Sequence, residues 1–167
     1  MHLTPVNDAE YADFSERQVL ECAGQLERAG EVTEHDSVAV ARDRLRALLA
    51  DELRANGHQF FVARSAIVKP RIGWVWVSPA PAFLGPSRER TRWLSQLTIE
   101  ETVRGRGWSR ALLNATERHL AQSGVEQLWL RVFDWNAPAR ALYDSQGYEL
   151  VERFANDSHL RKRLLVS

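Results

Sequence analysis

The chain has 167 residues, 44% of them hydrophobic and 26% charged, which is typical of an ordinary globular protein and predicts one domain over residues 1–167. Its 22 basic and 22 acidic side chains cancel, which argues against a protein built to coat nucleic acid or an anionic membrane. The single cysteine, Cys22, excludes an internal disulfide and a cysteine-rich zinc site, and we expect it to be a small core residue. No signal peptide or membrane-spanning stretch is visible, so a cytoplasmic protein is predicted.

The N-terminal third is predicted to form a short strand and two helices. The sequence MHLTPV is strand-like, and Asn7 or Asp8 can cap the helix that follows. In this helix, with a polar gap at Gln18, the apolar residues at helical spacing are Tyr11, Phe14, Cys22 and Leu26. In the second helix, one apolar face lies opposite arginines and acids and consists of Val38, Ala41, Leu45, Leu48, Leu49 and Leu53.

The middle of the chain changes to the pattern of β-strands. Residues 58–64 and 72–77 are rich in β-branched and aromatic residues, and Lys69-Pro70 between them suits a turn. Residues 78–90 contain three prolines and a glycine, so we expect a loop there. Residues 91–99 are predicted to form a third strand of this group.

The remaining elements complete an alternating pattern. A helix is predicted from Trp108 to about Ser123-Gly124, and residues 127–133 are apolar enough for a strand covered on both faces. Asn136 can cap another helix, which would end near Gly147, and two closing strands follow. The order β-α-α-β-β-β-α-β-α-β-β implies an α/β domain with one mixed central sheet.

The stretch TVRGRGWSRALL, residues 102–113, places two glycines just before a helix. Gly105 and Gly107 are poor helix formers, but a glycine turn lets the backbone approach a ligand, and the free amides at a helix start attract phosphate. Arg104 and Arg106 add positive charge at the same point. The stretch does not match the P-loop motif, because no glycine in it is followed by a lysine. It does not match the dinucleotide-binding motif either, because Arg110 stands where the third glycine is required. From this stretch alone, a ligand site and a plain tight turn both stay open.

Together with FDWNAPARALYDSQGYEL, residues 133–150, this stretch resembles the GNAT superfamily of acyl-CoA N-acyltransferases, in the branch with two early helices. The family's signature Arg/Gln-x-x-Gly-x-Gly/Ala is matched by Arg104, Gly107 and Ser109. The later family pattern is matched by Asn136, Ala139, Arg140, Leu142, Tyr143, Gly147 and Tyr148. The likeness is strong over about residues 92–150.

The resemblance implies a fold and a reaction. The fold would be one GNAT-like domain with a mixed, mostly antiparallel sheet, splayed at the acyl-CoA site and covered by helices on both faces. The reaction would move an acetyl group from acetyl-CoA to a primary amine of a small molecule, peptide or protein in a bacterial cell. It would need no metal, and the protein would bind no nucleic acid or membrane and would be a monomer or homodimer.

The resemblance also assigns roles to residues. The backbone amides of the glycine loop would hold the pyrophosphate, and this loop comprises Arg104, Gly105, Arg106, Gly107, Trp108 and Ser109. The strand before the loop would leave its neighbour at a bulge, and its residues Leu97, Thr98 and Ile99 would pair with pantetheine and polarise the thioester carbonyl. Asn136 would cap its helix and reach the pantetheine arm. Tyr143 would be catalytic and protonate the departing thiolate.

One family feature is missing. Many relatives place acids where this chain has Gln96 and Thr98, and neither residue can take a proton from the attacking amine. Glu100 and Glu101 would flank the loop in solvent, while a surface or structural role is favoured for two further candidates, His58 and Glu21. The general base therefore stays unassigned at this point.

Rival functions also remain. A GNAT-like domain that binds acyl-CoA without transferring it would fit the missing acids. The same fold could carry O-acylation or transfer of a longer acyl chain. A nucleic-acid regulator is disfavoured by the neutral charge.

Overall fold

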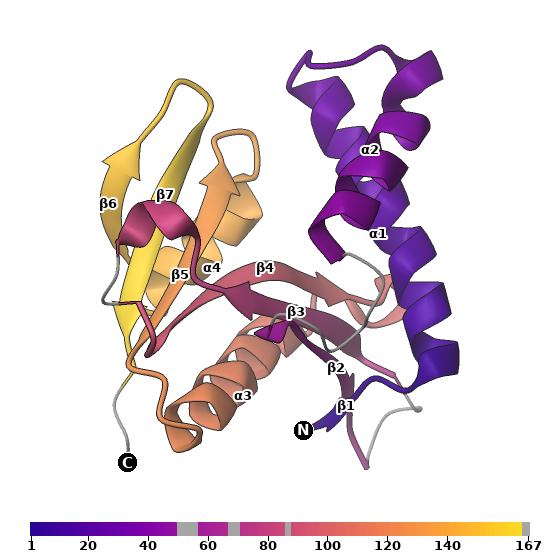
Figure 1. The fold of residues 1–167 in the computed structure, drawn as a ribbon. Helices are drawn as coiled ribbons and strands as arrows, with labels where there is room; N and C mark the ends of the chain where they lie inside the picture. Colours follow the sequence, from indigo (N-terminus) through magenta and orange to yellow (C-terminus); the bar gives the residue numbers. More distant parts are fainter. Residues whose placement is uncertain (50–56, 67–70, 86–87, 165–167) are drawn as a thin grey trace. The chain divides into compact units, whose positions relative to one another are not determined.

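A computed structural model describes residues 1–49, 57–66, 71–85 and 88–164 (Figure 1). By its contacts the chain separates into two compact units. The helical unit is Val6–Asn56, and the sheet unit combines Met1–Pro5 with Gly57–Ser167. The predicted order of strands and helices is confirmed, although the Lys69-Pro70 turn lies outside the described residues.

The helical unit contains α1 (Asp8–Arg28) and α2 (Glu34–Leu49), which contact each other. Asn7 begins α1 with a capping box: its Oδ1 accepts from the N–H of Glu10 at 2.9 Å, and its own N–H donates to the Glu10 carboxylate. These two bonds satisfy donors that a helix start otherwise leaves unpaired, which confirms the predicted cap.

The buried faces of the two helices differ in part from the predicted ones. Gln18 is buried on the same face as Phe14, whereas Cys22 is only half-buried, so its prediction as a core residue is wrong. On α2 the prediction for Val38 is also wrong, because Val38 is exposed and its neighbour Ser37 is buried. The side chains of Leu48 and Leu49, and all of Leu53, lie outside what the structure describes.

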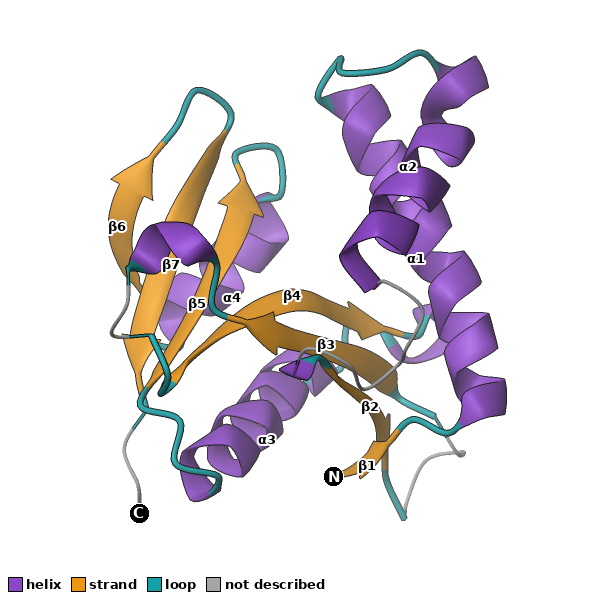
Figure 2. Ribbon diagram, in the orientation of Figure 1, coloured by secondary structure: helices purple, strands orange, loops and turns teal. Residues whose placement is uncertain are grey.

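The sheet unit is built on seven strands in the order β1-β2-β3-β4-β5-β7-β6 (Figure 2). β4 and β5 are parallel and every other neighbouring pair is antiparallel, as predicted for a mixed sheet. The strands are β1 (His2–Pro5), β2 (Gln59–Arg64), β3 (Gly73–Pro79), β4 (Thr91–Ile99), β5 (Gln127–Phe133), β6 (Glu149–Arg153) and β7 (Asp157–Arg163). The sheet unit also contains α3 (Trp108–Gln122), α4 (Ala137–Ser145) and the short 3-10 helices η2 (Ala82–Leu84) and η3 (Glu101–Val103).

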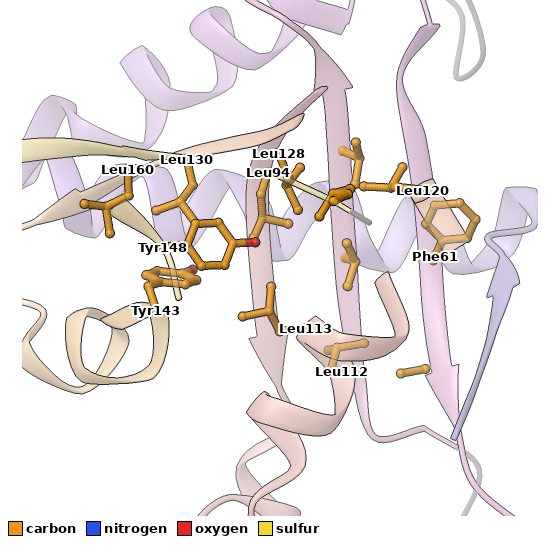
Figure 3. Close-up of a cluster of buried hydrophobic side chains, with 14 of the residues drawn as sticks. Phe61, Leu94, Leu112, Leu113, Leu120, Leu128, Leu130, Tyr143, Tyr148 and Leu160 are labelled. Atoms are coloured by element: carbon orange, nitrogen blue, oxygen red, sulfur yellow. The ribbon is translucent and has the colours of Figure 1, made fainter. Parts of the chain in front are cut away.

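The core of the sheet unit lies on one face of the sheet. Leucines from α3 and from β4, β5 and β7 meet there, together with Tyr143 and Tyr148 (Figure 3). In β5, Leu128 and Leu130 lie in the core, whereas on the other face Arg131 is exposed and Trp129 is half-buried. The prediction that both faces of this strand are covered is therefore wrong, because its second face carries a charged side chain in solvent. Within the described ranges, no helix combines the length and apolar character that crossing a bilayer requires.

Candidate active site

β4 and β5 lie side by side for only part of their length. Their pairing runs from Thr91 with Gln127 to Leu94 with Leu130, whereas β4 stays paired with β3 as far as Ile99. Figure 1 shows the two strands separating beyond this point. The predicted splay is confirmed, and it leaves one edge of β4 open from residue 95 onward.

A β-bulge marks the point of separation. Trp76 is opposite Gln96 and the next residue, Val77, is opposite Leu94, so Ser95 is the extra residue in β4. A bulge bends its strand and increases the local twist, which turns β4 away from β5. The Ser95 hydroxyl lies 2.8 Å from the Ser78 hydroxyl on β3, which holds the bulge against its other neighbour.

Along β4, the backbone N–H and carbonyl groups of alternate residues point to β3 and to the open edge. The N–H of Glu100 donates to the Ile72 carbonyl beside β3, and the Thr98 carbonyl also faces β3, where a Cβ added to Gly73 would meet it at 2.2 Å. Because successive backbone groups of a strand point to opposite sides, Leu97 and Ile99 face the open edge. Of the three β4 residues predicted to pair with pantetheine, Leu97 and Ile99 therefore direct backbone groups to the side of β4 that β5 has left.

The loop after β4 ends in two glycines with left-handed backbones. Gly105 has φ 75° and Gly107, the N-cap of α3, has φ 77°, which residues with a side chain rarely adopt. No side chain caps α3 within the described part of the chain, and no hydrogen bond joins the N–H groups of residues 105–109 to other described residues. A Cβ added to either glycine would meet no described atom within 4 Å. The helix start is thus an open cluster of free donors, as an anion site requires.

The other residues of the glycine loop lie around these free amides. Arg104 donates from Nε to the Ile99 carbonyl at 3.0 Å, so it fastens the loop to the end of β4. Arg106 is exposed, and Ser109 is half-buried in the first turn of α3. Trp108 packs against the core, and its buried Nε1 has no partner among the described residues.

α4 places Asn136 and Tyr143 in the sheet unit. The Asn136 Oδ1 accepts from the N–H of Ala139 at 3.3 Å, which confirms its capping role and leaves the side-chain amide as a donor. Tyr143 is 9% exposed, and its ring centroid lies 5.4 Å from that of Tyr148. Burial raises the pKa of Tyr143 to about 12, so its hydroxyl stays protonated at neutral pH.

The acids after β4 do not both lie in solvent. Glu100 is only 17% exposed, lies 2.6 Å from Nε of Arg71, and accepts from Trp74 Nε1 at 3.0 Å. The expectation that Glu100 is solvated is therefore wrong, because a cation and an indole bind the same carboxylate oxygen. Glu101 is 84% exposed, as expected.

The described residues do not identify a general base. Gln96 donates to the Thr98 hydroxyl at 2.9 Å, so the two positions that carry acids in relatives form a neutral pair. His58 Nδ1 accepts from Trp76 Nε1 at 3.0 Å, and burial lowers the His58 pKa. That bond needs the unprotonated Nδ1, so a proton taken there would break it. Glu21 lies on α1 in the helical unit.

Two features of the sheet unit were not located from the sequence. The family resemblance predicted a bulge in this strand but not its position at Ser95, which depends on how β3 pairs with β4. Glu117 is buried on α3 beside Lys162, and a sequence signal for it did exist. Glu117 falls between Leu113 and Leu120 at helical spacing, which places it on the apolar face of α3.

The chain belongs to the acetyltransferase (GNAT) family, whose sequence model matches residues 25–148. It is an acetyl-CoA-dependent N-acetyltransferase, in agreement with its structural neighbours. The family resemblance drawn from the two motifs is thereby confirmed.

Individual relatives have distinct degrees of similarity. The uncharacterized N-acetyltransferase YycN of Bacillus subtilis is 24% identical over 147 residues, covering 88% of this chain and 91% of that protein. Its crystal structure superposes with a TM-score of 0.82 over 92% of this chain and 95% of that chain, at 23% identity. The mycothiol acetyltransferase of Saccharomonospora viridis is 36% identical over 96 residues, which are 56% of this chain but 30% of that protein.

A further structural neighbour was solved with a ligand. The PaiA N-acetyltransferase of Thermoplasma acidophilum, in complex with coenzyme A, has a TM-score of 0.69 at 15% identity. The match covers 97% of this chain and 98% of that chain. At this identity the likeness shows a shared fold, and the fold is one that holds coenzyme A in that protein.

Proposed function

We propose that this chain transfers the acetyl group of acetyl-CoA to a primary amine through the gap between β4 and β5. The observation that carries the proposal is the coincidence of that gap with the free amides at the start of α3. Acetyl-CoA supplies the acetyl group as an activated thioester. The chain's contribution is to bind this molecule, align it with the amine and handle the protons.

The glycine loop would hold the pyrophosphate. The N–H groups of residues 105–109 have no acceptor among the described residues, and Arg106 adds a mobile positive charge. Arg104 keeps the loop next to β4 through its bond to the Ile99 carbonyl. The fit rests on donors that are otherwise unpaired and on glycines whose missing Cβ atoms leave the approach open.

The open edge of β4 and the start of α4 would hold the pantetheine arm. Leu97 presents its N–H and carbonyl to the open side, and Ile99 presents its N–H, while the Ile99 carbonyl already accepts from Arg104. An extended ligand can pair with these groups as a neighbouring strand would. Thr98 would contribute through its side chain, because its carbonyl faces β3. The Asn136 amide supplies a further donor beyond its capping bond.

Tyr143 would assist departure of the thiol. Its pKa of about 12 exceeds the ordinary thiol value of about 8.5, so the hydroxyl stabilises a departing sulfur mainly by donating a hydrogen bond. This pKa difference makes complete transfer of the Tyr143 proton to the thiolate unfavourable, so solvent would supply the proton that the thiolate finally takes up. The amine would lose its proton to water or to a group outside β4, since Gln96 and Thr98 are neutral.

We further propose that the protein acts as a single-domain monomer or homodimer in the cytoplasm, without a metal, a nucleic acid or a membrane. The balanced charge and the single cysteine support this setting. Release of free coenzyme A from acetyl-CoA, measured with a panel of primary amines, tests the function. If the protein binds acetyl-CoA but releases no coenzyme A with any amine of the panel, the alternative of a binding module is favoured instead.

A further inference from the structure

Tyr148 is joined to Tyr143 by the way in which α4 ends. The N–H of Tyr148 donates to the Tyr143 carbonyl at 3.1 Å, and the N–H of Gly147 donates to the Asp144 carbonyl at 3.1 Å. Gly147 has φ 79°, so the helix closes in a Schellman motif, which commonly brings the side chains at the positions of Tyr143 and Tyr148 into contact. Their ring centroids lie 5.4 Å apart, and Figure 3 shows the two rings side by side. The ring of Tyr148 therefore limits the orientations open to the ring of Tyr143.

The hydroxyl of Tyr148 lies inside the core. Tyr148 is 6% exposed, and its hydroxyl has no hydrogen-bond partner among the described residues. Burial, followed by the charge of Glu117, holds the pKa of Tyr148 well above its ordinary value, so the hydroxyl is a donor at neutral pH. A buried donor without an acceptor costs free energy, so an acceptor from a neighbouring element would stabilise this position of the ring.

Glu117 on α3 offers such an acceptor. Its Oε2 accepts from Nζ of Lys162 at 2.5 Å, whereas its Oε1 is buried and has no partner in the described part of the chain. The same ammonium of Lys162 lies 5.6 Å from the centroid of the Tyr148 ring. The free oxygen of Glu117 and the hydroxyl of Tyr148 are thus a buried acceptor and a buried donor near one ammonium, and a hydrogen bond between them would satisfy both groups.

We infer that Glu117, fixed by Lys162, holds the hydroxyl of Tyr148, and that the ring of Tyr148 keeps the hydroxyl of Tyr143 aimed at the departing sulfur. Glu117, Lys162 and Tyr148 are then positioning residues for the reaction. The inference rests on the proposed function, because it needs Tyr143 to assist departure of the thiol. In this arrangement the three residues act only through Tyr143, so their loss should lower kcat without changing the affinity for either substrate.

Two variants release the Tyr148 hydroxyl while they keep the core filled. Tyr148→Phe keeps the ring and the backbone bond, and the double variant Glu117→Gln, Lys162→Met leaves no unpaired charge. Each should lower kcat about five- to tenfold, because a slightly misplaced catalytic group slows the reaction, and leave both KM values within about twofold. The acceptor is the amine of the panel that gives the fastest release of coenzyme A. Thr116→Val is the matched control, since it removes a buried hydroxyl of α3 that bonds to the Leu112 carbonyl, and it should leave kcat unchanged.

The same substitutions combined with Tyr143→Phe separate positioning from a general loss of structure. Once the Tyr143 hydroxyl is gone, Tyr148→Phe and the double variant should change kcat less than about twofold, because the group that they position is absent. A merely structural role would lower kcat by the same factor with and without that hydroxyl, and this result overturns the inference. Unchanged kcat in Tyr148→Phe and in the double variant, with Tyr143 in place, also overturns it.

NMR of the protein labelled with ¹³C at Cζ of tyrosine tests the link independently of turnover. The chain has three tyrosines, so three Tyr→Phe variants assign the resonances. The Tyr143 resonance should shift or broaden in the double variant, which leaves both core tyrosines in place, and stay unchanged in Thr116→Val. A Tyr143 resonance that the double variant does not alter overturns the inference. Failure of the proposed function would appear separately, as no release of coenzyme A by the wild type with any amine.

Discussion

The carboxylate of Glu117 on α3 accepts a 2.5 Å hydrogen bond from the ammonium of Lys162 on β7. Glu117 is 9% exposed and lies beside Tyr148, whose pKa is raised well above its ordinary value by burial and by the Glu117 charge. The pair thus places two opposite charges at the edge of an otherwise apolar core next to Tyr143. Removal of one partner would leave the other charge buried and uncompensated.

Lys162→Met should therefore lower the free energy of unfolding by about 3 kcal/mol, near the lower end for a buried pair because Lys162 is about a quarter exposed. Urea unfolding followed by circular dichroism measures this change. The double variant Glu117→Gln, Lys162→Met should recover most of the loss, since no unpaired charge remains. If Lys162→Met is as stable as the wild type, the ion pair contributes nothing to the free energy of unfolding.

Gly107→Val should abolish binding of coenzyme A. A β-branched residue is strained at φ 77°, and its side chain would extend over the free amides at the start of α3. Calorimetry of coenzyme A binding provides the measurement. Gly124→Val is the matched control, because Gly124 has φ 82° at the other end of α3 and the same open surroundings. If both variants bind equally well, the glycine loop is only a turn.

Tyr143→Phe should lower turnover about 100-fold and leave the affinity for acetyl-CoA unchanged, because only a proton donor is removed. Steady-state release of coenzyme A and equilibrium binding give the two quantities. Tyr11→Phe in the helical unit serves as the control. A parallel loss of affinity and rate would identify Tyr143 as a binding or packing residue instead.

Alkaline pH should destabilise the fold partly through Tyr143. Burial raises its pKa from 10.0 to about 12, so between these values the unfolded chain loses a proton that the folded chain keeps. The free energy of unfolding should fall by about 1.4 kcal/mol per pH unit over this window for this residue alone. Urea unfolding at pH 9 to 11 should show a shallower fall in Tyr143→Phe. Identical slopes in both proteins would contradict the assigned pKa.

The rate should rise with pH toward the pKa of the acceptor amine, without an inflection near 6.5 from an enzyme group. Thr98→Glu should speed acetylation of high-pKa amines near neutral pH more than that of low-pKa amines, whereas Thr98→Gln should not. The test is the pH dependence of kcat/KM. Burial lowers the His58 pKa, so an inflection below the ordinary histidine value of about 6.5 that vanishes in His58→Gln would make His58 the base, despite its bond to Trp76.

The sequence determined which helices and strands form, and it identified the family of the chain. Asn7, Asn136 and Gly107 act within a few residues of the chain, and helix caps and left-handed turns depend on such neighbours alone. The two motifs identified the family for the same reason, since each lies in one continuous stretch of chain.

Only the tertiary structure decided how those elements meet. The bulge at Ser95 depends on the register of β3 against β4, and Glu100 is bound by Arg71 and Trp74 from a different part of the chain. The rings of Phe83 on η2 and His159 on β7 stack although these residues lie far apart in sequence. No local spacing encodes such contacts, because they form only when strands distant in the chain pair and place their alternate residues on one face.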